Sequence, residues 1–250
     1  MRTILILFFL FRIFWLDAQT CVDRKYSFGL EVIVENIEEQ IPSGWQLDDL
    51  QAQNFEDFDC GLLSAIIDKE YLKYPNKLRK ELKLKLVWFS EFKFEDVDYW
   101  GSYSSELKTV YLKSLGADQF YTRQLFHHEL SSILLMEYAS KTFEDEFRSL
   151  APKDFQYFDE VGSGRNAIGV RDSEEFEDEL NEQGFLNEYS MSFWENDFNE
   201  ISQNLFLPKT NFWEIFNEYP KVKEKTDLVI SFYQSIHPKF KKSFFQSLSK

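Results

Sequence analysis

The sequence predicts an α+β protein in which a small mixed sheet flanks a buried central helix, with a helical C-terminal lobe after it. First, apolar side chains alternate with lysine and glutamate in residues 82–94, as is typical of β-strands. Second, the pattern changes after Gly116, and residues 122–140 are apolar on nearly all sides of a helix. Third, the chain after Pro208 reads as helical throughout.

Before the central helix, the sequence alternates between strand and helix patterns. The helical prediction rests on Leu62 and Ile66, which recur at helical spacing with their neighbours before Pro75 ends the run. The expected elements are a strand at 26–34, a turn at 41–44, helix within 47–74, strands at 82–94 and 109–112, and a loop at 101–105.

After the central helix, at 121–141, the sequence predicts a loop-rich stretch at 144–172. Acidic residues 174–182 follow and are expected to form solvated helix faces. Further helices are predicted at 192–206, 211–218, 221–236 and 239–248. We therefore expect one domain at 19–250, with an α+β part at 19–141 and a mainly helical lobe at 142–250.

The composition supports a folded, acidic protein. The chain is 44% hydrophobic, 18% aromatic and carries a formal charge of −15, so it has material for a substantial core. A surface of this sign repels phosphate backbones and anionic lipids, so we expect no nucleic-acid partner.

The N-terminus reads as a secretory signal. Arg2 precedes an apolar run, and Ala18 is a small residue at a suitable cleavage position, so residues 1–18 are predicted to direct export to the periplasm, the cell envelope or the medium. Cys21 and Cys60 then allow two alternatives. Either they pair as a disulfide, or Cys21 carries a lipid anchor and gives the protein its only attachment to a membrane.

The central helix carries two of the three histidines of the chain. His127 and His128 are followed by Glu129, and His-Glu begins the zinc-peptidase motif H-E-x-x-H. In that motif the second histidine lies one helical turn after the first, but this chain has Ser132 there. From these residues alone, a structural helix with hydrogen-bonded histidines is a better interpretation than a metal site, because a single His-Glu pair is a weak signal.

Three later stretches extend the pattern. They are Pro152-Lys153-Asp154-Phe155-Gln156-Tyr157, Gly184-Phe185-Leu186-Asn187-Glu188-Tyr189-Ser190, and Glu195-Asn196-Asp197-Phe198-Asn199-Glu200. With His-Glu before them, they resemble the gluzincin-type zinc-binding metallopeptidases found as exported proteins and lipoproteins in Bacteroidetes. Those proteins carry H-E-x-x-H, Pro-x-x-Phe-x-Tyr, Gly-Phe-x-x-x-Tyr and Glu-Asp-Phe-x-Glu stretches in this order. The resemblance covers residues 125–206.

This resemblance implies a zincin-like hydrolase. His128 would be the first zinc ligand, and Glu129 would take a proton from zinc-bound water. Tyr189 would polarise a carbonyl or serve in packing. The candidates for the carboxylate ligand are Glu195, Asp197 and Glu200.

The departure at Ser132 leaves three alternatives open, because a hydroxyl is a poor zinc ligand. The chain is a metal-free pseudoenzyme, it binds zinc through an altered set that includes His127 or His237, or it does unrelated chemistry with His128 and Glu129. As an enzyme it would be a zinc-dependent peptidase. As a binding or scaffold protein it would hold a peptide, protein or glycan ligand at the cell envelope.

One expectation is geometric. The helix at 192–206 has a broad apolar surface, so it should pack across the central helix. That packing should bring a carboxylate of Glu195, Asp197 or Glu200 within about 8 Å of His128 if a shared site exists.

Overall fold

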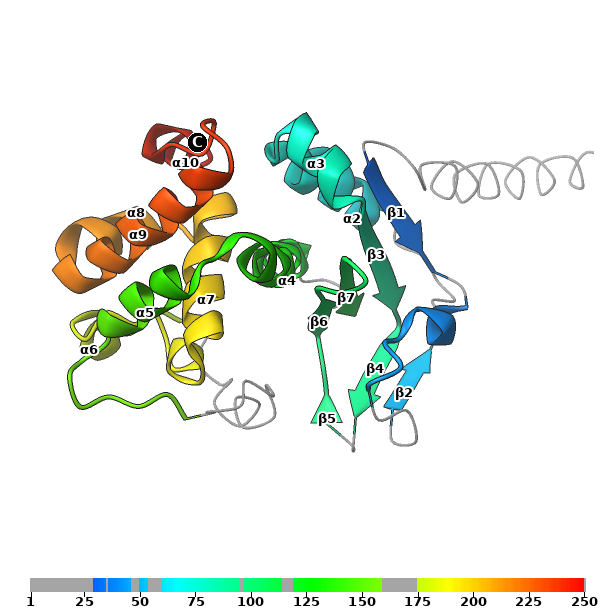
Figure 1. Cartoon of the computed structure of the whole chain (residues 1–250), viewed down its shortest axis with the longest axis horizontal. Helices are drawn as coiled ribbons and strands as arrows, with labels where there is room; N and C mark the ends of the chain where they lie inside the picture. Colours follow the sequence, from blue (N-terminus) through cyan, green and yellow to red (C-terminus); the bar gives the residue numbers. More distant parts are fainter. Residues whose placement is uncertain are drawn as a thin grey trace, which may run out of the picture. The chain divides into compact units, whose positions relative to one another are not determined.

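The computed structural model describes residues 29–34, 36–45, 50–53, 60–94, 97–113, 119–158 and 175–249 (Figure 1). The predicted signal at 1–18, Cys21 and the side chain of Cys60 lie outside this described part. The fold is α+β, as the sequence predicts. The chain divides into two compact units, Met1–Arg123 and Gln124–Lys250. The division falls within the central helix rather than at residue 141.

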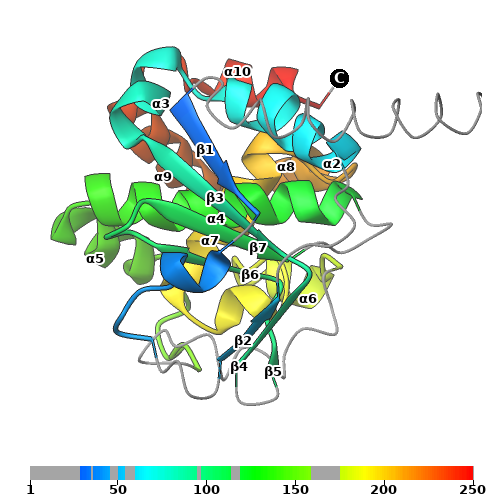
Figure 2. The ribbon, with the colours of Figure 1, turned by 90° about the vertical axis from the view of Figure 1, so that its right-hand side faces the viewer.

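The first unit contains a four-stranded mixed sheet in the order β1-β3-β7-β6. Its strands are β1 (Leu30–Ile33), β3 (Leu84–Phe89), β7 (Thr109–Lys113) and β6 (Gly101–Ser104). β1, β3 and β7 are parallel, and β6 pairs antiparallel with β7 at the edge (Figure 2). All of β3 is buried except Lys85, as expected for the middle of a parallel sheet.

A three-stranded antiparallel sheet in the same unit has the order β2-β4-β5. It consists of β2 (Leu50–Gln53), β4 (Glu91–Phe94) and β5 (Val97–Asp98). The single strand predicted at 82–94 is therefore wrong: β3 and β4 belong to different sheets and separate at Ser90. The ring of Phe89 stacks on that of Phe92, with centroids 4.7 Å apart, so the turn between the sheets is packed.

The helices of this unit are short. They are η2 (Ile37–Gln40), α2 (Cys60–Ala65), the π-turn η4 (Ile66–Glu70), η5 (Tyr71–Lys73) and α3 (Asn76–Leu82). Lys83 adopts a left-handed conformation (φ 48°) and ends α3, so Leu82 belongs to this helix and not to a strand. Within the stretch 47–74, where helix was expected, residues 50–53 form β2 and the described helices lie at Cys60 and beyond. The loop expected at 101–105 forms β6 at Gly101–Ser104.

The second unit is helical in its described part. Its central helix, α4 (Gln119–Tyr138), begins just before the unit boundary, and Ser140 caps the next helix through a hydrogen bond from the Phe143 amide to its hydroxyl. The other elements are α5 (Lys141–Ser149), α6 (Asp178–Asn181), η7 (Tyr189–Met191), α7 (Trp194–Phe206), α8 (Phe212–Glu218), α9 (Pro220–Ile236) and α10 (Lys242–Ser247). No described helix has the length and hydropathy to cross a bilayer.

Helix α7 lies in the core of the second unit. Phe206 packs edge-on against Tyr233 of α9 and Phe245 of α10, and Phe198 packs against Phe232. Every residue of α7 except Asn196 is buried. Its polar side chains consequently need hydrogen-bond partners inside the protein, because an unpaired buried polar group costs about 1–3 kcal/mol.

Candidate functional site

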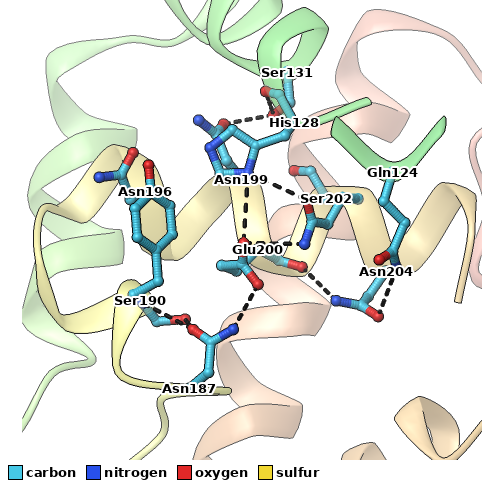
Figure 3. Close-up of polar contacts among 12 residues, drawn as sticks. Gln124, His128, Ser131, Asn187, Ser190, Asn196, Asn199, Glu200, Ser202 and Asn204 are labelled. Atoms are coloured by element: carbon cyan, nitrogen blue, oxygen red, sulfur yellow. Dashed lines mark hydrogen bonds and ion pairs between the residues drawn. The ribbon is translucent and has the colours of Figure 1, made fainter. Parts of the chain in front are cut away.

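A buried polar cluster joins α4 to α7 (Figure 3). On α4, His128, Ser131 and Ser132 recur at helical spacing and form a stripe within otherwise apolar surface. On α7, Asn199, Glu200 and Gln203 supply the facing groups. The predicted packing of these two helices is confirmed by the contacts between them.

The centre of the cluster is an ion pair between His128 and Glu200. The Nδ1 atom of His128 lies 3.5 Å from Oε1 of Glu200, and both side chains are almost fully buried. The same Nδ1 donates to Oε1 of Gln203 at 3.2 Å. Gln203 also donates from Nε2 to Oε1 of Glu200 at 3.0 Å, so its amide bridges the two charged groups.

A second set of contacts holds the other oxygen of Glu200. Asn187, in the loop before η7, donates from Nδ2 to Oε2 of Glu200 at 2.8 Å. Asn187 is fixed in turn, because its Oδ1 accepts hydrogen bonds from the backbone amide and the hydroxyl of Ser190, both at 3.0 Å. Each carboxylate oxygen of Glu200 therefore accepts an amide hydrogen bond from within the unit.

The two serines of α4 are held by Asn199. Its Nδ2 donates to the hydroxyl oxygen of Ser132 at 2.7 Å. The hydroxyl of Ser131 faces both Oδ1 of Asn199 and the carbonyl oxygen of His128. The position where H-E-x-x-H has its second histidine is thus occupied by a serine that belongs to a hydrogen-bonded helix contact.

The surroundings favour a protonated His128. Burial by itself lowers the pKa of His128, but the hydrogen bond to Glu200 and the negative charges of Glu129 and Glu200 outweigh it and raise the pKa above its usual value of 6.5. The hydrogen bond to Gln203 acts in the same direction. These contacts therefore favour the charged form of His128 over the neutral one.

The structure separates the three predicted carboxylate candidates. Glu200 forms the contact with His128 that the sequence predicts, well inside 8 Å. Glu195 lies buried in the first turn of α7. Asp197 forms a buried ion pair with Lys225 of α9, with Nζ and Oδ2 2.6 Å apart.

The remaining predicted residues fall into two groups. Tyr189 lies at the site, with its ring centroid 5.7 Å from that of His128. Glu129 is buried, and its negative charge raises the pKa of His128. His127 instead stacks on Phe206, with centroids 5.0 Å apart. His237 caps the end of α9, where its Nδ1 accepts from the Lys239 amide at 3.1 Å.

Among the described residues, the side chains around His128 do not fit a three-ligand zinc site. His128 and Glu200 supply two donors of suitable chemistry, whereas the third position holds the hydroxyl of Ser132, which is bound to Asn199. Within the described residues, no group of three or more His, Cys, Asp and Glu side chains is placed to hold a metal ion.

Sequence reasoning missed two features of this site. The amides of Asn187, Asn199 and Gln203 were not singled out, although their signal was present: Asn199 and Gln203 lie one turn apart on a helix that must be buried. The Asp197–Lys225 pair was also missed, because the two residues are 28 positions apart. Burial raises the pKa of Asp197 and lowers that of Lys225, against their mutual attraction.

Comparison with known proteins adds no relative. No family model matches the chain, and neither the curated proteins nor the solved structures contain a match. The site is therefore interpreted from its own geometry.

Proposed function

We propose that this chain is an exported binding protein of metallopeptidase-like architecture, in which an ion pair between His128 and Glu200 stands in place of a zinc centre. The observation that carries the proposal is the hydrogen bond from Asn199 to Ser132 at 2.7 Å. Through this hydrogen bond, Ser132, which replaces the second histidine of H-E-x-x-H, takes part in the contact between helices α4 and α7. The ligand of such a protein would be a peptide or protein met outside the cytoplasm.

The hydrogen bonds of Glu200 support the same conclusion. Its two oxygens accept from Gln203 at 3.0 Å and from Asn187 at 2.8 Å, while His128 faces it with a ring nitrogen. Zinc binding would require a ligand geometry with bonds of about 2 Å and would displace these amides. The buried charges are already compensated by protein groups, so the cluster is stable as a helix-to-helix contact without metal.

The alternative is a zinc peptidase with an altered ligand set. The observation that favours it is that His128 and Glu200, two of the expected ligands, lie within 3.5 Å of each other, with Glu129 directly after the histidine. Such a site would recruit its third ligand from outside H-E-x-x-H. Retention of zinc by the unmodified protein distinguishes it from the binding protein.

The experiment is zinc saturation, desalting and elemental analysis of the purified chain and two variants. Ser132→His creates the one-turn histidine pair with His128. Met136→His is the matched control, because it adds the same side chain at an exposed position of the same helix, eight residues or about 12 Å along its axis from His128. We expect sub-stoichiometric zinc in the unmodified chain and in Met136→His. We expect Ser132→His to retain more, up to about one zinc per chain.

Zinc retention by the unmodified chain would support the alternative. Stoichiometric zinc in the unmodified chain that is lost in Glu200→Gln would overturn the proposal and support the altered-site peptidase. Circular dichroism of each variant checks that the helical unit is intact.

A further inference from the structure

A separate pocket of about 500 Å³ opens in the second unit. It lies between the end of α5, the segment after it and Phe193 at the start of α7. Its volume is in the range of small-molecule sites, about 300–1,000 Å³. Pro152, Phe155 and Tyr157 of the Pro-x-x-Phe-x-Tyr stretch form part of the pocket wall. The stretch therefore lines this pocket and is not part of the His128 cluster.

Hydrogen bonds and ring contacts fix the aromatic wall of the pocket, formed by Phe155 and Tyr157. The hydroxyl of Tyr157 donates to Oδ2 of Asp197 at 2.9 Å, and Asp197 is bound to the fully buried Lys225. The ring of Phe155 packs on Tyr157 and on Phe185, with centroid distances of 5.1 and 4.5 Å. The wall is therefore preformed, and a ligand would not bear the entropic cost of ordering it.

The backbone of this stretch is fixed as well. The Phe155 amide donates to the carbonyl of Pro152 at 2.9 Å and closes a turn. Three residues on, the Phe158 amide donates to the carbonyl of Met191 at 3.3 Å, which ties the segment to η7.

The charge of the lining is opposite to that of the protein. The chain carries a formal charge of −15, yet the charged side chains that line the pocket are Arg148 and Lys153, both cations. Arg148 also contacts Glu144 through an exposed pair at 3.1 Å. Such pairs are worth about 0–1 kcal/mol, so a ligand carboxylate could replace Glu144 as its partner.

From this combination we infer that the pocket binds a carboxylate carried on an aromatic or apolar body. The carboxylate would lie between Arg148 and Lys153, where guanidinium can form two parallel hydrogen bonds. The apolar body would lie against Phe155, Tyr157 and Phe193. A free carboxylic acid and the C-terminal residue of a peptide both have this chemistry. The inference is independent of the metal question, because the pocket shares no residue with the His128–Glu200 cluster.

The test is isothermal titration of the full chain with three probes. N-acetylphenylalanine carries the carboxylate and the ring, N-acetylphenylalanine amide lacks only the charge, and the peptide Ala-Ala-Phe presents the same group at a chain end. We expect the acid to bind at least about tenfold more tightly than the amide, as is typical for loss of a charge-assisted hydrogen bond. Binding of Ala-Ala-Phe at least as tight as that of the acid assigns the pocket to peptide ends, and weaker binding assigns it to free acids.

Variants locate the site. Arg148→Gln and Lys153→Gln should each weaken binding of the acid about tenfold while leaving the weak binding of the amide unchanged. Lys241→Gln is the matched control, because it makes the same kind of change at an exposed cation of the same unit that does not line the pocket. Equal affinity for acid and amide, no heat with any probe, or an equal effect of Lys241→Gln would overturn the inference. Thermal unfolding of each variant confirms that these surface changes leave the fold intact.

Discussion

Replacement of Glu200 by glutamine tests whether the centre of the cluster is an ionised pair. At 3.5 Å and an effective dielectric constant of about 20, the attraction between the two charges is about 5 kcal/mol before desolvation. Breaking a buried pair on one side typically costs about 3–5 kcal/mol. We expect Glu200→Gln to lose about 3 kcal/mol of unfolding free energy at pH 6.

The effect should depend on pH, with a sign that follows from His128. The folded-state pKa of His128 is raised above 6.5, so the stability from its extra proton is fully present below about pH 6.5 and is lost as pH rises through the raised value. Glu200→Gln removes the main cause of that rise. The difference between the variant and the unmodified chain should therefore shrink as pH increases.

The assay is urea unfolding at a series of pH values from 5.5 to 9, followed by circular dichroism. With a slope of about 3 kcal/mol per M, the expected loss at pH 6 shifts the midpoint by about 1 M. Glu195→Gln is the control, since it makes the same change in the same helix about 140° around its axis. The control should give a difference that is constant with pH. A Glu200→Gln profile parallel to that of the unmodified chain would refute an ionised pair.

Substitutions at three further sites test the packing, turn and capping contacts of the second unit. Lys225→Met leaves Asp197 buried without its cation and should lower the free energy of unfolding by about 3–5 kcal/mol. Adding Asp197→Leu should recover most of this loss. A thermal melt in which the single variant is unchanged would argue against the ion pair. Gly184→Ala should lose about 1–2 kcal/mol in urea unfolding, because Gly184 has φ +95° and a new Cβ would lie 3.0 Å from Cβ of Lys221; a neutral result would contradict the left-handed turn. Ser140→Ala should lower stability by about 1 kcal/mol, with Ser140→Gly less costly, by removing the cap of α5; equal melting temperatures would show that the cap contributes nothing.

The hydrophobic periodicity of a segment was sufficient to predict its secondary structure where that segment buries an apolar face of its own. The periodicities of β7, α4 and the C-terminal helices predicted the fold class and placed these elements, whereas the alternation at 82–94 indicated strand without its division into β3 and β4. Pattern failed for β2 and β6, whose sequences are Leu-Gln-Ala-Gln and Gly-Ser-Tyr-Ser. Each is a strand because a neighbouring strand supplies its hydrogen bonds, and pairing with a distant segment leaves little trace in the segment's own composition.

The candidate site divides in the same way. The sequence by itself determined that α4 carries His128 in a narrow polar stripe, that Ser132 breaks H-E-x-x-H, and that a carboxylate of a later helix should face His128. It favoured Glu195 and Glu200 without choosing between them and kept Asp197 as a further candidate. Tertiary structure chose Glu200, because successive residues of α7 point about 100° apart and the helix can turn only one face toward α4. The same rotation directs Asp197 to Lys225, so the packing of the helices, and no local signal, decided which carboxylate meets the histidine.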